Sequence, residues 1–146
     1  MAYRTITITS NQPPKEGKAS GTIYPGMALY RTSTADQVAV HNVQQGKIHG
    51  NLVAIEDELQ GNGIADAYST TNRILFRSFL PGDEVYLKIK SGQNISIGDK
   101  LVSGGNGYFE KERADSSAVD DVDSFAVALE ACNATAGTAM CRAEVS

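Results

Sequence analysis

The sequence contains no tryptophan, only two cysteines and only four prolines among its 146 residues. Two cysteines are too few for a domain held together mainly by disulfides, and four prolines exclude a proline-rich linker protein. No apolar run approaches the roughly 18 residues of a membrane-spanning helix, and the first residues lack the apolar region of a secretory signal. We therefore expect a protein made in a cytoplasm and without a membrane partner.

A surplus of basic charge is also missing. The 13 basic and 17 acidic residues give a net charge of −4, which provides no reason to expect nucleic acid as a partner. Residues 110–123 hold six acids and two bases, so this one segment accounts for the whole net charge. A hydrophobic content of 41% with 21% charged residues is typical of a folded domain.

Short β-branched and aromatic segments recur about every ten residues, separated by glycine-rich turns. One helical turn is expected at residues 56–60, and Ile95 and Ile97 are expected to bury one face of a short strand. The pattern predicts an all-β fold, a compact β-barrel or β-sandwich that forms a single domain over residues 21–146. Its predicted strands cover residues 27–31, 37–42, 51–55, 73–79, 84–90, 100–103, 108–111, 125–131 and 139–145.

Residues 1–20 are expected to form an extended N-terminal arm. Residues 3–9 alternate, with Ile6 and Ile8 on one face and threonines on the other, as in a strand with two distinct faces. Pro13 and Pro14 follow in a polar segment that favours polyproline geometry and disfavours regular pairing. Such a strand can pair with a neighbouring chain or extend the edge of its own sheet, and the sequence leaves both open.

No catalytic or metal-binding motif stands out. His41 and His49 match no recognised zinc spacing and are interpreted as surface or loop histidines. The aspartates of residues 115–123 lack the spaced ligands and central glycine of a calcium loop, which favours a solvated acidic loop. There is no Gly-x-Ser-x-Gly motif, and neither cysteine has a histidine nearby in sequence. The sequence therefore predicts no enzyme, no cofactor and no metal.

Cys132 and Cys141 form a candidate disulfide. A terminal hairpin with a loop at residues 135–138 would place Ala134 opposite Ala139, and hence Cys132 opposite Cys141. In a reducing cytoplasm both begin as thiols. Three states stay open: free buried thiols, a bond within the chain and a cross-link between subunits.

Several turn and strand motifs occur together in a characteristic order. They are LPGDEVYL at residues 80–87, SGQNISIGDKL at 91–101 and GGNGYF at 104–109, with further matching segments at 61–68 and 126–131. In this order the motifs resemble the decoration, or cement, proteins of tailed-bacteriophage capsids. The resemblance covers about residues 20–146. Its motifs are turn and strand motifs and contain no catalytic residue.

The resemblance implies a structural virion protein on the outer surface of the capsid, synthesised in the host cytoplasm. Such a protein cements neighbouring subunits of the major capsid protein and stabilises the DNA-filled head, and the family favours a homotrimer. The residues expected to contact the capsid or other subunits lie in the arm. They are Tyr3, Arg4, Ile6 and Ile8, with Pro13 and Pro14 setting the direction of the chain.

Two other functions stay open. A receptor- or carbohydrate-binding β-domain of the virion would stack sugars on tyrosines, although the absence of tryptophan weakens this alternative. Its candidate residues are Tyr24, Tyr30, Tyr68 and Tyr108. A carrier domain resembling biotinyl or lipoyl modules would use a lysine near a turn, as at residues 98–101, but the usual Met-Lys-Met hairpin is absent.

Overall fold

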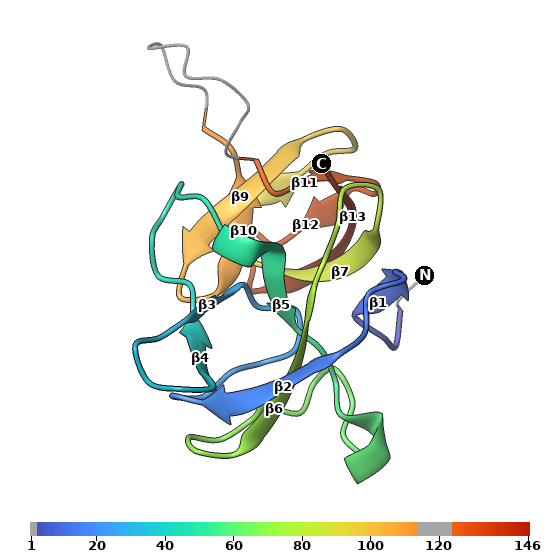
Figure 1. The fold of residues 1–146 in the computed structure, drawn as a ribbon. Coiled ribbons are helices and arrows are strands. Elements are labelled where there is room, and N and C mark those ends of the chain that lie inside the picture. The colour runs from blue at the N-terminus through green and yellow to red at the C-terminus, as the bar shows by residue number, and fades with distance from the viewer. Residues whose placement is uncertain (1–2, 114–123) are drawn as a thin grey trace.

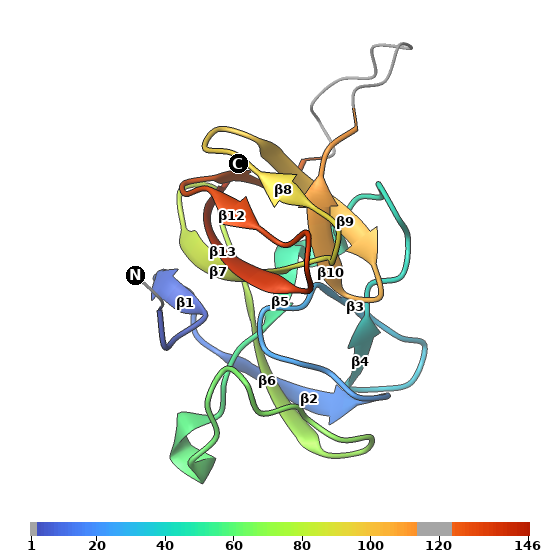
Figure 2. The same ribbon diagram turned by 180° about the vertical axis from the view of Figure 1, so that it is seen from behind.

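The computed structural model describes residues 3–113 and 124–146 and is built from strands (Figures 1 and 2). This confirms the predicted all-β class; the predicted acidic loop lies outside the described residues. No described helix is long and apolar enough to span a membrane. The strands are β1 (Thr7–Thr9), β2 (Lys15–Ala19), β3 (Leu29–Arg31), β4 (Gln37–Val40), β5 (Leu52–Ala54), β6 (Arg73–Ser78), β7 (Glu84–Ile89), β8 (Asn94–Ile95), β9 (Lys100–Gly105), β10 (Tyr108–Lys111), β11 (Ala126–Ala128), β12 (Cys132–Asn133) and β13 (Ala139–Val145), with short 3-10 turns η1 (His49–Asn51) and η2 (Glu58–Gln60).

Five strands curl into a first barrel, in the order β3-β4-β2-β6-β5. A bridge between Ala28 and Val53 joins the two edges of this sheet, so that the barrel is nearly closed. Residues at alternate positions, such as Ile74 and Phe76 of β6, fill its interior. At Gly17 of β2, a Cβ atom would lie only 2.8 Å from the carbonyl oxygen of Asp36, so the parallel neighbour β4 leaves room for glycine alone.

A second barrel follows the order β7-β10-β9-β11-β13 and closes because β13 pairs with β7 from Glu84 to Ile89. Strand β1 also joins β7, with Thr7 opposite Val85, and β12 pairs with β8 in a separate two-stranded sheet. The core of this barrel includes Phe109 and Phe125, whose ring centroids lie 5.1 Å apart. Small alanines of β11 and β13 complete it.

Strand β5 is the wall between the two barrels. Leu52 and Ala54 pack in the first core, whereas Val53 and Ile55 pack in the second. Successive side chains of a strand point to opposite faces, so one three-residue strand supplies both cores and is buried along its whole length. The two barrels therefore meet at β5, which packs into both cores; Figure 1 shows where this strand lies in the fold.

Two parts of the prediction need correction. Strand β2 lies in the segment that the proline pair was expected to keep out of regular pairing. Pairing begins directly after Pro14, with Lys15 opposite Phe76, so the prolines precede the strand and remove none of its hydrogen bonds. Ile95 is buried as expected, but Ile97 is 72% exposed because the two-residue strand β8 has already ended.

Candidate interaction surfaces

The predicted N-terminal arm packs on its own chain. Strand β1 pairs with β7, and β2 pairs with β6 and β4. Ile6 is fully buried in the second core, and Tyr3 and Ile8 pack against the same core. Of the two alternatives left open by the sequence, the structure therefore has the strand that extends its own sheet.

Glu56 fastens this segment to the end of β5. Its buried carboxylate accepts hydrogen bonds from the backbone N–H of Ile6 at 2.9 Å and from the hydroxyl of Thr5 at 2.6 Å. The ring of Tyr3 meets that of Tyr86 edge-on, with centroids 5.4 Å apart. A buried carboxylate is stable when donors satisfy it, so Glu56 and residues 3–8 hold each other in place.

The six predicted contact residues are divided between interior and surface. The aromatic and aliphatic ones are used within the chain: Ile6 is buried, and Tyr3 and Ile8 are half-buried. The exposed ones are Arg4, Pro13 and Pro14.

A groove of about 340 Å³ lies between the N-terminal segment, η2 and β6, and Pro14 and Leu59 both line it. Leu59 is 91% exposed at the tip of η2. Asp57 accepts a hydrogen bond from Arg73 at 2.8 Å through one carboxylate oxygen. Its other oxygen, Oδ1, and Nε of Arg77 are buried without a partner among the described residues. The groove thus combines an exposed apolar rim with unpaired polar groups.

A second depression, of about 450 Å³, lies at one end of the first barrel, where β2 and β5 begin and β3 and β6 end. Tyr30 lines it and is the one exposed member of the four tyrosines considered for sugar binding, at 42%. Tyr68 is buried and donates a hydrogen bond to the carbonyl of Ile55 at 2.6 Å. Tyr24 and Tyr108 pack partly buried against the first core.

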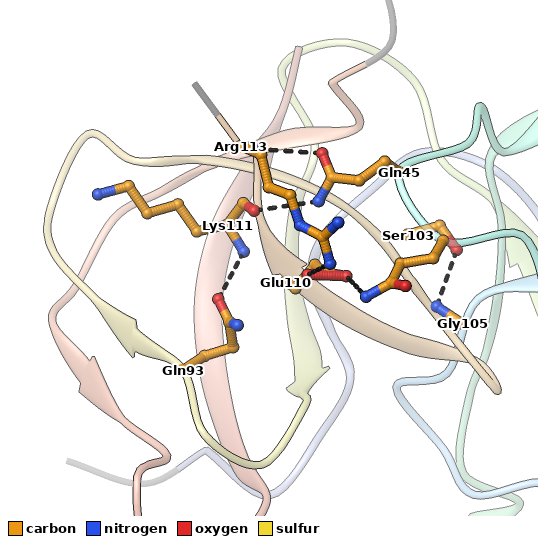
Figure 3. A network of polar contacts seen from close by, with 8 residues as sticks. Gln45, Gln93, Ser103, Gly105, Glu110, Lys111 and Arg113 are labelled. Carbon is orange, nitrogen blue, oxygen red and sulfur yellow. Dashed lines mark hydrogen bonds and ion pairs between the residues drawn. The ribbon is translucent and has the colours of Figure 1, made fainter. Parts of the chain in front are cut away.

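A polar network holds the end of β10 (Figure 3). The buried carboxylate of Glu110 accepts a hydrogen bond from Gln44 at 2.9 Å and lies 3.6 Å from the guanidinium of Arg113. The side-chain amide of Gln45 forms two hydrogen bonds with the backbone at and just after the end of β10, as a paired strand would. It accepts a hydrogen bond from the N–H of Arg113 at 3.1 Å and donates one to the carbonyl of Lys111 at 3.3 Å. Each charge in this network therefore has a partner.

His41 lies in a loop, as interpreted from the sequence, but it is buried and not at the surface. Its Nε2 lies 3.0 Å from the carbonyl of Lys47, which only accepts, so Nε2 carries the proton and donates. Nδ1 then accepts from the hydroxyl of Ser103, on β9, at 2.8 Å. Burial, reinforced by nearby His49, lowers the pKa of His41. No cluster of three or more metal-ligating side chains occurs within residues 3–113 and 124–146.

Cys132 and Cys141 are buried free thiols. Their register differs from the predicted hairpin, because Ala128 lies opposite Ala143 and β12 pairs with β8. Each thiol still points toward the other segment: Cys132 donates to the carbonyl of Met140 at 3.1 Å, and Cys141 to that of Glu130 at 3.5 Å. Burial raises the pKa of both thiols, that of Cys141 to about 12. The disulfide between them stays a prediction.

Comparison with known proteins finds similarity of structure alone. No family model matches the sequence, and no curated protein matches it. The fold is similar to the crystal structure of the head fiber gp8.5 N base in bacteriophage phi29, with a TM-score of 0.59 and 12% sequence identity. The similarity covers 92% of this chain and 94% of that one. At this identity it establishes a shared fold.

Proposed function

We propose that this chain is a non-enzymatic structural protein of a bacteriophage head. The observation that carries the proposal is the similarity, over nearly the whole length of both chains, to the N base of a phage head fiber. The order of turn and strand motifs between residues 61 and 131, which resembles phage decoration proteins, supports the same role from the sequence.

Within this role, we propose that the protein binds the outside of the capsid, bridges subunits of the major capsid protein and stabilises the filled head. The contact surface would be formed by Arg4, Pro13, Pro14 and Leu59. Pro14 and Leu59 line the same groove, and Arg4 directly precedes Thr5, which lines it too. Glu56 holds this surface in shape before any partner arrives, which reduces the entropy lost on binding.

Cosedimentation tests the contact surface. Heads assembled without this protein are mixed with the purified chain, and bound protein is measured after pelleting. We expect saturable binding by the unaltered chain and at least tenfold weaker binding by the Leu59→Ser variant. The matched control is Ile97→Ser, which removes an exposed aliphatic side chain from the turn after β8 and should bind normally. Equal binding of the two variants would overturn the proposed surface, and no binding by the unaltered chain would overturn the function.

Cementing and oligomeric state need separate measurements. Decorated heads should release their DNA at a higher temperature than bare heads, because bridging contacts must break before the shell opens. The homotrimer is proposed from the resemblance to decoration proteins, and native mass spectrometry should give three times the chain mass of 15.5 kDa. A monomer at working concentration would contradict the trimer without touching the proposed attachment to the head.

A further inference from the structure

The depression at the end of the first barrel, which forms its mouth, is lined by basic side chains. Two of them occupy strand positions whose side chains face the inside of the barrel. Lys15 lies opposite Phe76, and Arg31 lies opposite Val38. Opposed residues of paired strands project from the same face of the sheet, and both Phe76 and Val38 are fully buried. Lys15 and Arg31 therefore stand on the inward face, at the end where the apolar filling stops.

These cations have no acidic partner among the described residues. The depression is lined by Lys15, Tyr30, Arg31, His49, Gly50, Leu52 and Ser78, none of them acidic. Within residues 3–113 and 124–146, no ion pair involves Lys15 or Arg31. Arg31 lies 5.5 Å from the ring centroid of Phe76, across the end of the core. Uncompensated positive charge in a concave site attracts an anion.

The remaining walls offer a shaped, largely apolar surface. Leu52 is buried and belongs to the first core, and Tyr30 presents a partly exposed ring. The hydroxyl of Ser78 donates to the carbonyl of Gly50 at 2.5 Å, which fixes the loop that forms one side. A volume of about 450 Å³ is within the range of small-ligand sites, and barrel mouths are a common place for them.

We propose that this mouth binds an acidic saccharide. Its carboxylate or sulfate group lies between Lys15 and Arg31, and its sugar ring reaches across the rim to Tyr30, which lines the depression from the other face of β3. A lone oxyanion would leave the tyrosine ring uncovered, and a peptide of acidic residues alone has no ring to cover it. The site is distinct from the proposed capsid surface, whose residues do not line it.

The test is a titration followed by ¹H–¹⁵N NMR at low salt. The probes are a hexuronic acid disaccharide, a sulfated disaccharide, maltose, tetraglutamate and sodium sulfate. We expect both acidic disaccharides to bind and to shift the amide signals of Gly50 and Leu52, with maltose at least tenfold weaker. Lys15→Gln and Arg31→Gln should each weaken binding about tenfold, the loss expected for one charge-assisted contact.

Lys18→Gln is the matched control, because Lys18 is an exposed cation on the same strand that does not line the mouth. It should bind the acidic disaccharides normally, and Lys15→Gln should occupy heads as the unaltered chain does. Arg31→Lys, which keeps the charge, should retain more affinity than Arg31→Gln. Equal binding of maltose, equal or tighter binding of sulfate or tetraglutamate, or no shift at the mouth would each overturn the proposal.

Discussion

Two sites, one in each barrel, treat charged groups in opposite ways. In the second barrel, buried Glu110 accepts a hydrogen bond from Gln44 and forms an ion pair with Arg113 (Figure 3). In the first barrel, Lys15 and Arg31 face the mouth, and no acidic residue in the described part of the chain pairs with them. Partnered charges keep a fold in shape, whereas unpartnered charges in a depression remain available to a ligand. The comparison separates a structural network from a candidate binding site within one chain.

The largest effect is expected from emptying either core. Phe76→Ala in the first barrel and Phe109→Ala in the second should each lower the free energy of unfolding by about 3–5 kcal/mol. Because β5 supplies side chains to both cores, each variant should unfold in a single transition. Circular dichroism and tyrosine fluorescence should give the same midpoint. Alanine replacement of exposed Tyr30 is the control and should cost far less.

Two separate unfolding transitions in either variant would contradict this prediction. They would mean that the barrels are independent units and that β5 couples them only weakly.

The second-largest effect concerns the thiols, which occur in the second barrel. Diamide, a thiol oxidant, should remove one hydrogen from each thiol and lower the mass of the monomer by two hydrogens. The bond should raise the free energy of unfolding by roughly 2–3 kcal/mol, the value for a loop of this length. Because burial raises the pKa of both thiols, oxidation should be slow at neutral pH and faster in alkali.

Cys132→Ser is the control and should show neither change. A dimer on a non-reducing gel of the unaltered protein would instead indicate a cross-link between subunits.

A third test addresses the segment that contributes strands to both barrels. Glu56→Gln places an amide where two donors, the Ile6 N–H and the Thr5 hydroxyl, need acceptors. The free energy of unfolding should fall by about 1–3 kcal/mol, and hydrogen exchange at the Ile6 amide should become faster. Glu58→Gln, at an exposed neighbouring carboxylate, should change neither value. Unchanged exchange at Ile6 in Glu56→Gln would show that β1 pairing alone holds the segment.

Much of the fold was readable from local pattern. Periodic segments such as residues 84–90 and 139–145 match β7 and β13 closely, because alternation and turn glycines are local signals. The strand β2 was missed because its residues, Lys15–Ala19, carry neither β-branched side chains nor alternation. Its place in the barrel depends on glycine fitting beside Asp36, which is a contact across 19 residues of sequence.

The sites were less readable for a related reason. Lys15, Arg31 and His49 are far apart in sequence, and only closure of the first barrel brings them to one mouth. Ile6 and Ile8 had the pattern of an interaction strand, and that pattern is the same whether the partner is another chain or β7. Sequence periodicity reports that a face is covered, but it does not report what covers it.

The smallest expected effect is the pH dependence of the tie between barrels. His41 joins the loop after β4 to Ser103 of β9 as a neutral ring. Since its pKa is lower in the folded chain than in the unfolded one, the unfolded chain binds more protons in mild acid. His41 should therefore contribute stability above its ordinary pKa of 6.5 and lose that contribution as the pH falls below it. Urea unfolding between pH 8 and pH 5 should show a declining free energy for the unaltered chain and a flatter profile for His41→Asn. His49→Asn, at an exposed ring, should retain most of the slope. Parallel profiles for the unaltered chain and His41→Asn would show that the boundary between the barrels is held by β5 without this hydrogen-bonded tie.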